Sequence, residues 1–527
     1  MRAAKSYVLM TQSQTQKDDR KDFLATGTSR SAIIINGALA AIYFFAILFF
    51  FKRGDMTMFW ILIAGEVFHL WQLFTYLYTV WDTRYMPHFD PTCEPAVDIF
   101  VTVCGEPVEI VEQTVRAIKG LDYSSFRVYI LNDGYVANKP GWQDIESMAA
   151  RLGVDCITRK APGGAKAGNI NNGLRLTASP LVAVFDADHV PHRDFLKKTV
   201  GYFGDPKMGF VQSPQFYKNH AKNAVTAGAW EQQALFFGAI CMGKNRLNAA
   251  TMCGTNMVIR RSALEEVGGI CEESIAEDFV TGMFIHQRGW KSCYVPEVLA
   301  EGLAPEDFLS YTKQQFRWAR GSLDVLFRYN FLFKRGLSGA QKIQYLSSVS
   351  YFLSGFVVLM NAAIPLVFFF FGVTPLQIST MLLAAIFLPY IFLTIYVLQS
   401  STNYSYSFRS LAFSMAGFNI HISAMLAGIM GKKSSFSVTS KKQLSGNFAN
   451  LVMPHFGYVT LCLVGLAVAI TRDGLSASVM SNAAWAILNA SVFGQYAAAA
   501  MPERAIKAAP SFSRTSRKET ARSAVTS

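Results

Sequence analysis

The sequence predicts a bundle of membrane-spanning α-helices joined to one α/β domain. Hydrophobic residues make up 51% of the 527 residues and charged residues only 16%, which excludes a disordered chain. Long apolar stretches without charge occur towards both ends of the chain. In the middle, at 81–342, charges and turn residues return, and short apolar runs alternate with helical patterns, as they do in parallel α/β sheets.

Six stretches are long and apolar enough to cross a bilayer core, which needs about 20 residues per helix. No charge interrupts 343–408, and the windows 443–471 and 474–502 are also uncharged. The predicted spans are 32–51, 57–80, 346–371, 377–399, 449–470 and 480–500.

The distribution of basic residues predicts the orientation of these spans. Six Lys or Arg residues lie in the first thirty residues, and six more follow the last span. Since positive segments stay in the cytoplasm, both termini are expected inside, which requires an even number of spans. The uncharged segment 410–431 is therefore predicted to lie at the cytoplasmic interface, although its length would also suit a seventh span.

These boundaries divide the chain into seven parts, with the α/β domain in the cytoplasm. The predicted parts are a cytoplasmic segment 1–31, two spans in 32–80, the α/β domain 81–342, two spans in 343–400, an interface helix and loop in 401–447, two spans in 448–500 and a basic tail 501–527.

Three short apolar runs in the central domain read as buried parallel strands. They are Val97–Val103, Arg127–Leu131 and Leu181–Phe185, and Val108–Gly120 between the first two reads as a crossover helix. Ligands of such sheets bind at the carboxyl ends of the strands. The polar residues that directly follow each strand are therefore the candidates for a site.

A metal site is predicted after the third strand, at Asp186, Asp188 and His189. Two carboxylates and an imidazole suit Mg²⁺ or Mn²⁺ bridged to a diphosphate. An isolated Asp-x-Asp is more often a solvated turn, and only its position at a strand end favours the metal. Neither GxGxxG nor GxxxxGK[ST] occurs, so dinucleotide and P-loop chemistry are disfavoured.

Three further motifs could act on a phosphorylated ligand. The glycine-rich loop around Lys166 could cradle phosphate oxygens, or be an ordinary loop. Glu277-Asp278 opens a predicted helix, where an acid is stabilised by the helix dipole or could serve as a general base. In Gln314-x-x-Arg317-Trp318, the guanidinium could clamp a phosphate and the indole could stack on a sugar, or both could belong to an interfacial belt.

Together and in this order, these motifs resemble those of the family 2 membrane-bound glycosyltransferases, most closely bacterial cellulose and curdlan synthases. The family pattern D, DxD, TED, QxxRW appears as Asp133, Asp186/Asp188, Glu277-Asp278 and Gln314/Arg317/Trp318. A segment similar to the cellulose synthase gating loop FxVTxK contains Phe436, Val438, Thr439 and Lys441. The first acid of the usual Asp-Asp-Gly is Asn132 here, and the first position of TED is Ala276.

The resemblance implies a GT-A-like domain and a role for each matched residue. Asp278 is implied as the general base, and Asp186, Asp188 and His189 as ligands of Mg²⁺ or Mn²⁺. Residues implied to bind the donor are Thr102, Glu106, Asp133, Lys166, Asp186, Gln314 and Arg317. Those implied to contact the acceptor are Cys253, Gly254, Thr255, Glu277 and Trp318.

The implied activity is processive, inverting polymerisation of glucose from UDP-glucose, with export of the glucan through the enzyme's own channel in a bacterial inner membrane. The 27 residues after the last span leave no room for the cyclic-di-GMP-binding domain of many cellulose synthases. That and the motif departures favour a curdlan-like β-1,3-glucan, with cellulose or a mixed-linkage glucan as alternatives. Accessory export subunits are possible partners.

Two other functions remain open: a non-processive glycosyltransferase that makes a glycolipid, and a transporter with a nucleotide-binding domain. The complete carboxylate set argues against the transporter. No nucleic-acid partner is expected, because the excess charge of 49 − 36 = +13 lies largely beside the membrane spans.

Overall fold

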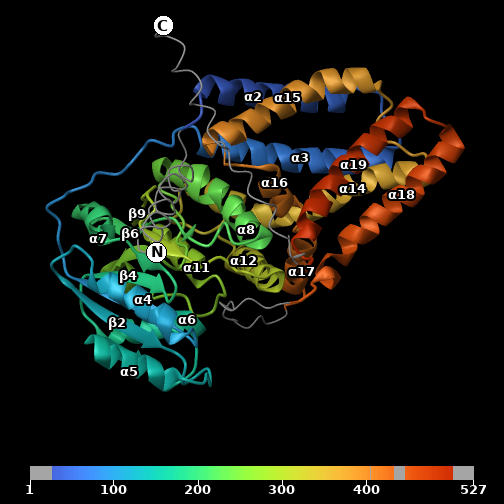
Figure 1. Cartoon of the computed structure of the whole chain (residues 1–527). Coiled ribbons are helices and arrows are strands. Elements are labelled where there is room, and N and C mark those ends of the chain that lie inside the picture. Colours follow the sequence, from blue (N-terminus) through green and yellow to red (C-terminus); the bar gives the residue numbers. More distant parts are fainter. Residues whose placement is uncertain (1–26, 404, 432–445, 503–527) are drawn as a thin grey trace, which may run out of the picture.

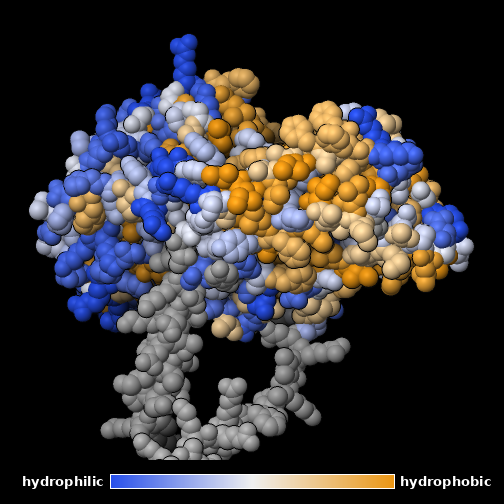
Figure 2. All heavy atoms as spheres, turned by 90° about the horizontal axis from the view of Figure 1, so that it is seen from above, coloured by the Kyte–Doolittle hydropathy of each residue, from blue (hydrophilic) through white to orange (hydrophobic). Residues whose placement is uncertain are grey.

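The computed structural model describes residues 27–403, 405–431 and 446–502. An α/β domain occupies one side of the molecule and a group of long helices the other (Figure 1). The apolar surface gathers over the long helices, while hydrophilic residues dominate the α/β domain (Figure 2). Side chains such as Phe50, 84% exposed, and Leu463, 67% exposed, belong to that apolar surface.

The α/β domain is built on a seven-stranded sheet with the strand order β3-β2-β1-β4-β8-β6-β9. The first four of these are parallel, and β8 runs antiparallel to both of its neighbours. The strands are β1 (Val97–Val103), β2 (Phe126–Asn132), β3 (Asp155–Thr158), β4 (Leu181–Asp186), β6 (Met208–Gln212), β8 (Met257–Arg260) and β9 (Lys291–Tyr294). The three strands predicted from apolar runs are confirmed as β1, β2 and β4.

Helices cover both faces of the sheet, which explains why the central strand β1 is buried at every position and mostly apolar. Alternate β1 residues such as Val101 pack in one core with α4 (Val108–Lys119) and α5 (Trp142–Leu152). Phe100 points to the other face and packs in a second core with α6 (Ala165–Leu176). The predicted crossover helix 108–120 is confirmed as α4.

A second, small sheet and several helices complete the domain. The small sheet has the order β5-β10-β7. Its strands are β5 (Val190–Pro191), β7 (Phe216–Tyr217) and β10 (Ala300–Gly302). The helices are α7 (Phe195–Thr199), α8 (Ala224–Leu235), α9 (Cys241–Lys244), α10 (Arg261–Glu266), α11 (Glu277–Gln287) and α12 (Phe308–Tyr329). Helix α13 (Gly339–Ser350) leads from the domain into the long helices and packs against both α12 and α3.

The long helices form the second region. They are α2 (Arg30–Phe45, continued by a wider turn over Ala46–Phe50), α3 (Met56–Thr79), α14 (Ser354–Phe371), α15 (Thr380–Ser401), α18 (Met453–Asp473) and α19 (Ala477–Ala498). Helix α15 packs along α2, and α14 packs against α3, α18 and α19. A GT-A-like α/β domain joined to a membrane-type helical region, the fold class expected from the sequence, is confirmed.

Among the described residues, six helical segments are long and apolar enough to cross a membrane: Arg30–Phe50, Met56–Thr79, Gly339–Phe371, Met381–Ser401, Phe408–Ile429 and Ala449–Asp473. Five of them overlap predicted spans. The sixth predicted span, α19, is not in this set, because its sequence ASVMSNAAWAILNASVFGQYAA is rich in Ala, Ser and Asn. The segment predicted to lie at the interface, 410–431, is in the set.

That segment is not one continuous helix in the structure. It divides into α16 (Phe408–Met415) and α17 (Phe418–Ile429), with a break at Ala416-Gly417. At 1.5 Å per residue, helices of 8 and 12 residues are about 12 and 18 Å long, against a hydrocarbon core of about 30 Å. Helix α16 packs against α8 and α17 packs against α12, so both adjoin helices of the α/β domain.

Candidate active site

The carboxyl ends of β1, β2 and β4 meet at one edge of the sheet, because these strands are adjacent and parallel. The backbone register pairs Thr102 with Asp186 across β1 and β4. The Thr102 hydroxyl lies 3.3 Å from an Asp186 carboxylate oxygen, to which it donates. Two of the predicted donor residues are therefore in contact, as their positions at strand ends required.

At the end of β2, Asp133 forms a two-pronged ion pair with Arg159. The distances are 2.9 Å from Nε to Oδ1 and 2.7 Å from Nη2 to Oδ2, and both side chains are buried. Burial raises the pKa of Asp133, although the guanidinium opposes this. Arg159 also donates to the carbonyls of Gly163 and Ala165. It thus joins the predicted donor residue Asp133 to the glycine-rich loop.

Lys166, at the start of α6, points to the same edge. Its ammonium contacts Asp186 and donates to the carbonyl of Gly254 at 2.8 Å. Burial by itself would lower the pKa of Lys166, but the nearby carboxylates of Asp186, Glu277 and Asp278 raise it, so the side chain is cationic. Asp186 responds in the opposite sense: burial raises its pKa, Lys166 and His189 lower it, and the net direction is down.

Glu277 and Asp278 open α11 beside this ammonium. Burial and, second, the charge of its neighbour Asp278 raise the pKa of Glu277 to about 7, although Lys166 and Arg317 oppose the rise. Burial also raises the pKa of Asp278. Two adjacent buried carboxyls cannot both ionise at low energy cost, so one proton is held by the pair near neutral pH.

The loop Cys253-Gly254-Thr255 passes directly against Asp278. Gly254 has a φ of +77°, and a Cβ placed on it would lie 2.8 Å from Asp278 Oδ2, so only glycine fits there. Gln212, at the end of β6, fixes the loop by accepting from the Cys253 N–H at 2.9 Å and donating to the Thr255 carbonyl at 2.8 Å. The predicted acceptor residues are thus held next to the predicted base.

The predicted metal ligands Asp186, Asp188 and His189 are close in sequence, but their side chains do not converge on one position. Asp186 is 36% exposed, whereas Asp188 is buried and accepts from the Leu303 N–H at 3.1 Å. His189 lies with Nδ1 3.6 Å from Asp188 Oδ1, and neither ring nitrogen has a hydrogen-bond partner within the described chain. No three His, Cys, Asp or Glu side chains of the described residues converge on one metal position. A cation at this position would therefore have to take further oxygens from a diphosphate.

In the loop that follows β1, Glu106 accepts from the Cys104 N–H at 2.6 Å. Burial raises the pKa of Glu106, and the charges of Asp188 and Asp186 add to the rise. It therefore faces the same group of carboxylates.

Helix α12 carries Gln314, Arg317 and Trp318, and it brings Arg317 to the site. One turn further along, Gly321 packs on Ala276: a Cβ on Gly321 would lie 2.6 Å from the Ala276 Cβ. Arg317 is close enough to Glu277 to lower its pKa. A hydrogen bond from Gln314 lowers the pKa of the Tyr217 phenol, although burial keeps it raised overall.

The predicted gating-loop residues Phe436, Val438, Thr439 and Lys441 lie outside the described residues. Of the other predicted site residues, Trp318 lies on α12 directly after Arg317, and the rest lie at or near the edge where β1, β2 and β4 end. Arg159 and Gln212 were missed by sequence reasoning. Recognising β3, which ends at Thr158, would have placed Arg159 at the same edge.

A mixed sheet with carboxylates at its strand ends, attached to long apolar helices, defines a membrane glycosyltransferase class. Residues 95–321 match the model of "Glycosyltransferase like family 2", and residues 264–496 match that of "Cellulose synthase". The chain therefore carries a glycosyltransferase family 2 domain that continues into a cellulose synthase domain.

Relatives and solved structures agree with this assignment. The cellulose synthase catalytic subunit (UDP-forming) of Pseudomonas fluorescens is 30% identical over 86% of this chain and 64% of its own length. Putative cellulose synthase 2 of Komagataeibacter xylinus is 33% identical over 72% of this chain and 26% of its own. A mannosyltransferase from Pyrobaculum calidifontis, solved with GDP-Man and Mn²⁺, has a TM-score of 0.51 at 18% identity, covering 71% of this chain and all of that one.

The chain spans from about a quarter to just under two thirds of the length of these two curated relatives. The apolar helices together with these relatives mark it as a membrane protein.

Proposed function

We propose that the protein is a processive, inverting β-glucan synthase that uses UDP-glucose and passes the glucan out through its helical region. One observation carries the proposal: Lys166 contacts the donor-side Asp186 and the acceptor-side carbonyl of Gly254, beside which Asp278 lies. A sugar held between these groups would have leaving group, acceptor and base in one place.

Donor binding is proposed to redistribute the charges at this edge. A diphosphate would compete with Asp186 for the Lys166 ammonium, and Arg317 would add a second cation. Thr102, Glu106 and Asp133 would contact the nucleoside, and Arg159 would hold Asp133 in place. The Cys253 to Thr255 loop, Glu277 and Trp318 would hold the end of the growing glucan.

Asp186, Asp188 and His189 are proposed to hold a divalent cation, Mg²⁺ or Mn²⁺. The exposed Asp186 and the unpartnered nitrogens of buried His189 support this. When bound, such a cation neutralises the charge that develops on the leaving diphosphate.

Asp278 is proposed to take the proton from the acceptor hydroxyl as general base. The hydroxyl oxygen forms a bond to C1 of the donor glucose while the bond from C1 to the phosphate oxygen breaks, which inverts the configuration at C1. Burial raises the pKa of Asp278, which makes its carboxylate a stronger proton acceptor and suits it to act as a general base. Asp278 is proposed over Glu277 because Asp278 lies against Gly254 in the acceptor loop.

The proposed orientation places the α/β domain and both termini in the cytoplasm of a bacterial cell, with α19 as the sixth span. The lengths of α16 and α17, and their packing on α8 and α12, support an interfacial position for 410–431. Cysteine labelling from each side of the membrane at Lys441→Cys and Leu475→Cys tests this orientation. Lys441→Cys should react only from the inside and Leu475→Cys only from the outside.

The linkage of the product is proposed as β-1,3, on the motif departures described above, with β-1,4 as the rival favoured by the names of the relatives. The test supplies the protein in lipid nanodiscs with a panel of UDP-sugars and Mg²⁺ or Mn²⁺. UDP release is followed, and any polymer is digested with linkage-specific glucanases. A polymer from UDP-glucose supports the synthase, and the enzyme that digests it identifies the linkage. UDP release with only a glycolipid product would support the non-processive alternative instead.

A further inference from the structure

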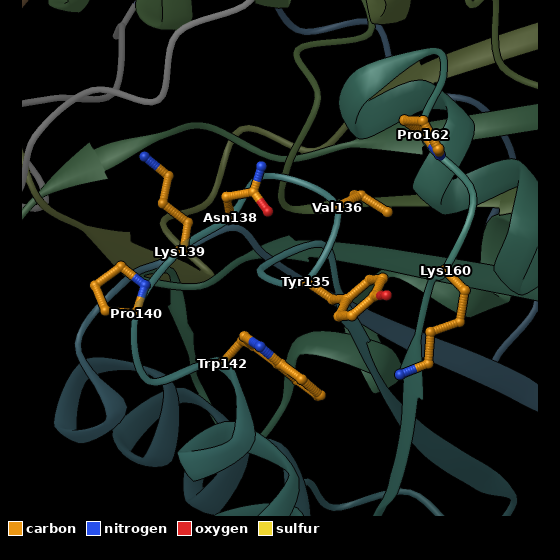
Figure 3. A pocket seen from close by; sticks show the side chains of 8 residues that line it. All are labelled: Tyr135, Val136, Asn138, Lys139, Pro140, Trp142, Lys160 and Pro162. Atoms are coloured by element: carbon orange, nitrogen blue, oxygen red, sulfur yellow. The ribbon is translucent and has the colours of Figure 1, made fainter.

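A cleft of about 570 Å³ lies beside the candidate active site, at the edge of the sheet near β2 and β3. Figure 3 shows its walls, which come from the loop that follows Asp133 and from the segment that follows Arg159. Its lining includes Tyr135, Asn138, Lys139, Trp142, Lys160 and Pro162. None of these residues belongs to the donor, acceptor or metal sets described above.

Two aromatic rings and a lysine form one end of the cleft. The rings of Tyr135 and Trp142 lie 5.3 Å apart and nearly perpendicular, at 83°. The Lys160 ammonium lies over both, 4.4 Å from the Tyr135 centroid and 4.8 Å from that of Trp142. Tyr135 is 43% exposed, so a flat ligand can reach a ring face while its anionic groups meet the ammonium.

A second cation lies at the other end of the cleft, where Figure 3 shows Lys139 beside Pro140 and Asn138. Throughout the described part of the chain, neither Lys139 nor Lys160 forms an ion pair with a carboxylate, whereas the exposed Lys197 and Lys291 each have one. None of the residues that line the cleft is acidic. The cleft therefore carries uncompensated positive charge next to the exposed ring of Tyr135 and the half-buried ring of Trp142.

We propose that this cleft binds a nucleotide at a second site, separate from the sugar donor. The base would stack on Tyr135 or Trp142, and the phosphates would pair with Lys160 and Lys139. A neutral oligosaccharide could also stack on these rings, but it would leave both ammonium groups without a partner, which is why an anionic ring compound is favoured.

Hydrogen bonds and a close side-chain contact connect the cleft to the loops that carry the predicted donor-binding residues. The Trp142 carbonyl accepts from the Asn132 amide at 3.0 Å, and the Asn132 side-chain oxygen accepts from the Gly134 N–H at 2.9 Å. Lys139 lies against Gly105 of the loop after β1, where a Cβ would come within 2.8 Å of its side chain. A ligand in the cleft contacts the segments that flank Asp133 and Arg159, so its binding is coupled to donor binding, and the coupling is reciprocal.

The test uses the full chain in nanodiscs, saturated with UDP and Mg²⁺ so that the donor site is filled. ADP and GDP are then titrated by calorimetry. We expect at least one of them to bind with one site per chain and to weaken as salt rises. Lys160→Gln and Trp142→Ala should each weaken this binding at least tenfold, and Lys139→Gln severalfold.

Matched controls come from a second lysine–tryptophan pair far along the sequence, Lys207 over Trp290 at 5.7 Å. Lys207→Gln and Trp290→Ala should leave the nucleotide affinity unchanged, and an unchanged thermal midpoint shows that each variant is folded. The proposal is overturned if neither nucleotide binds to the UDP-saturated protein, or if Lys160→Gln binds as the parent does. It is also overturned if laminari- or cello-oligosaccharides bind there without salt dependence. Failure of UDP itself to bind would count against the proposed function, and ADP or GDP titrated alone would then test the cleft.

Discussion

Ion pairs hold several buried polar side chains of the α/β domain, whereas the contacts of α2 with α15 and of α3 with α13 are made by neutral hydrogen bonds. In the domain, Arg261 pairs with buried Asp98 at 2.8 Å, and Arg159 pairs with Asp133 at 2.7 Å. Asp98 also accepts from the backbone and hydroxyl of Ser179, at 2.9 and 2.7 Å.

Among the helices, Asn36 of α2 donates to Thr394 of α15 at 2.8 Å, and Gln344 of α13 donates to Thr79 of α3 at 2.8 Å. Neither pair places a full charge in an apolar surrounding, where the desolvation penalty is several kcal/mol per ion. The difference teaches that ion pairs hold buried polar groups of the domain both at the site, as in Arg159–Asp133, and away from it, as in Arg261–Asp98, and that neutral hydrogen bonds hold these helices together.

Lys244 marks the boundary between these regions. Its ammonium is buried and bonds only to hydroxyls among the described residues, Thr251 at 2.8 Å and Ser348 of α13 at 2.9 Å. Burial lowers its pKa. Thr251 stands two positions before Cys253, where the acceptor loop begins, so this lysine connects that loop to α13, the first helix towards the membrane.

The largest effect on the catalytic rate is expected when the carboxylate proposed as general base is removed. Asp278→Asn removes the proposed base, so UDP release should fall by a factor on the order of 10² to 10⁴ while UDP binding persists. Calorimetry with UDP and Mg²⁺ separates the two quantities. The exposed Asp144→Asn serves as control. Full activity in Asp278→Asn together with loss in Glu277→Gln would transfer the role to Glu277.

The next largest effect is expected on the free energy of unfolding, when a buried ion pair of the α/β domain is broken. Asp98→Asn leaves Arg261 buried without its counter-charge and should destabilise the protein by about 3–5 kcal/mol. Asp205→Asn breaks a more exposed pair with Lys291, and should cost at most about 1 kcal/mol. Thermal midpoints of the two variants in the same nanodiscs measure the contrast. Equal midpoints would mean that burial does not distinguish the two pairs.

The shared proton of Glu277 and Asp278 predicts a pH dependence. Activity should rise as pH increases through about 7, where the pair loses this proton, and should fall up to tenfold per pH unit below that. The raised pKa of Glu277 means that the folded state binds more protons than the unfolded state. The stabilisation that Glu277 contributes is therefore fully present below its ordinary pKa and is lost as the pH rises towards 7. In Glu277→Gln the activity midpoint should move to lower pH. An unmoved midpoint would assign the titration to another group.

The contact between α11 and α12 should be sensitive to one methyl group. Gly321→Ala forces the new Cβ towards Ala276 and should cost about 1–3 kcal/mol, and it should also lower activity because Arg317 and Trp318 lie one turn away. Gly457→Ala, in α18 where nothing lies near the added carbon, should instead stabilise by about 0.5–1 kcal/mol. Thermal midpoints that move in the same direction would contradict this difference.

The smallest effect on the free energy of unfolding is expected when one hydrogen bond between the long helices α2 and α15 is removed. Thr394→Val removes one neutral hydrogen bond from Asn36, which keeps the Tyr390 carbonyl at 3.4 Å as a partner. The loss should be about 0.6 kcal/mol, a typical value between membrane helices. A fall in the thermal midpoint as large as that of Asp98→Asn would erase the distinction between the two regions.

The sequence by itself determined the strands β1, β2 and β4 and the two-part fold class. It could do so because continuous apolar runs bounded by polar residues have few alternatives to a strand buried on both faces. It also placed Thr102, Asp133 and Asp186 at one edge, since parallel strands end on the same side. The assignment of the remaining site residues depended on the order of the motifs.

Only the tertiary structure decided which of these groups touch. Arg159 reaches Asp133, and Lys166 reaches both Asp186 and Gly254, across separations of 26, 20 and 88 residues. No periodicity or spacing encodes such pairings, because they depend on how strands and helices pack. The same holds for 410–431: its composition suits a single membrane span, but packing against α8, α12 and α19 accompanies its division into two short helices.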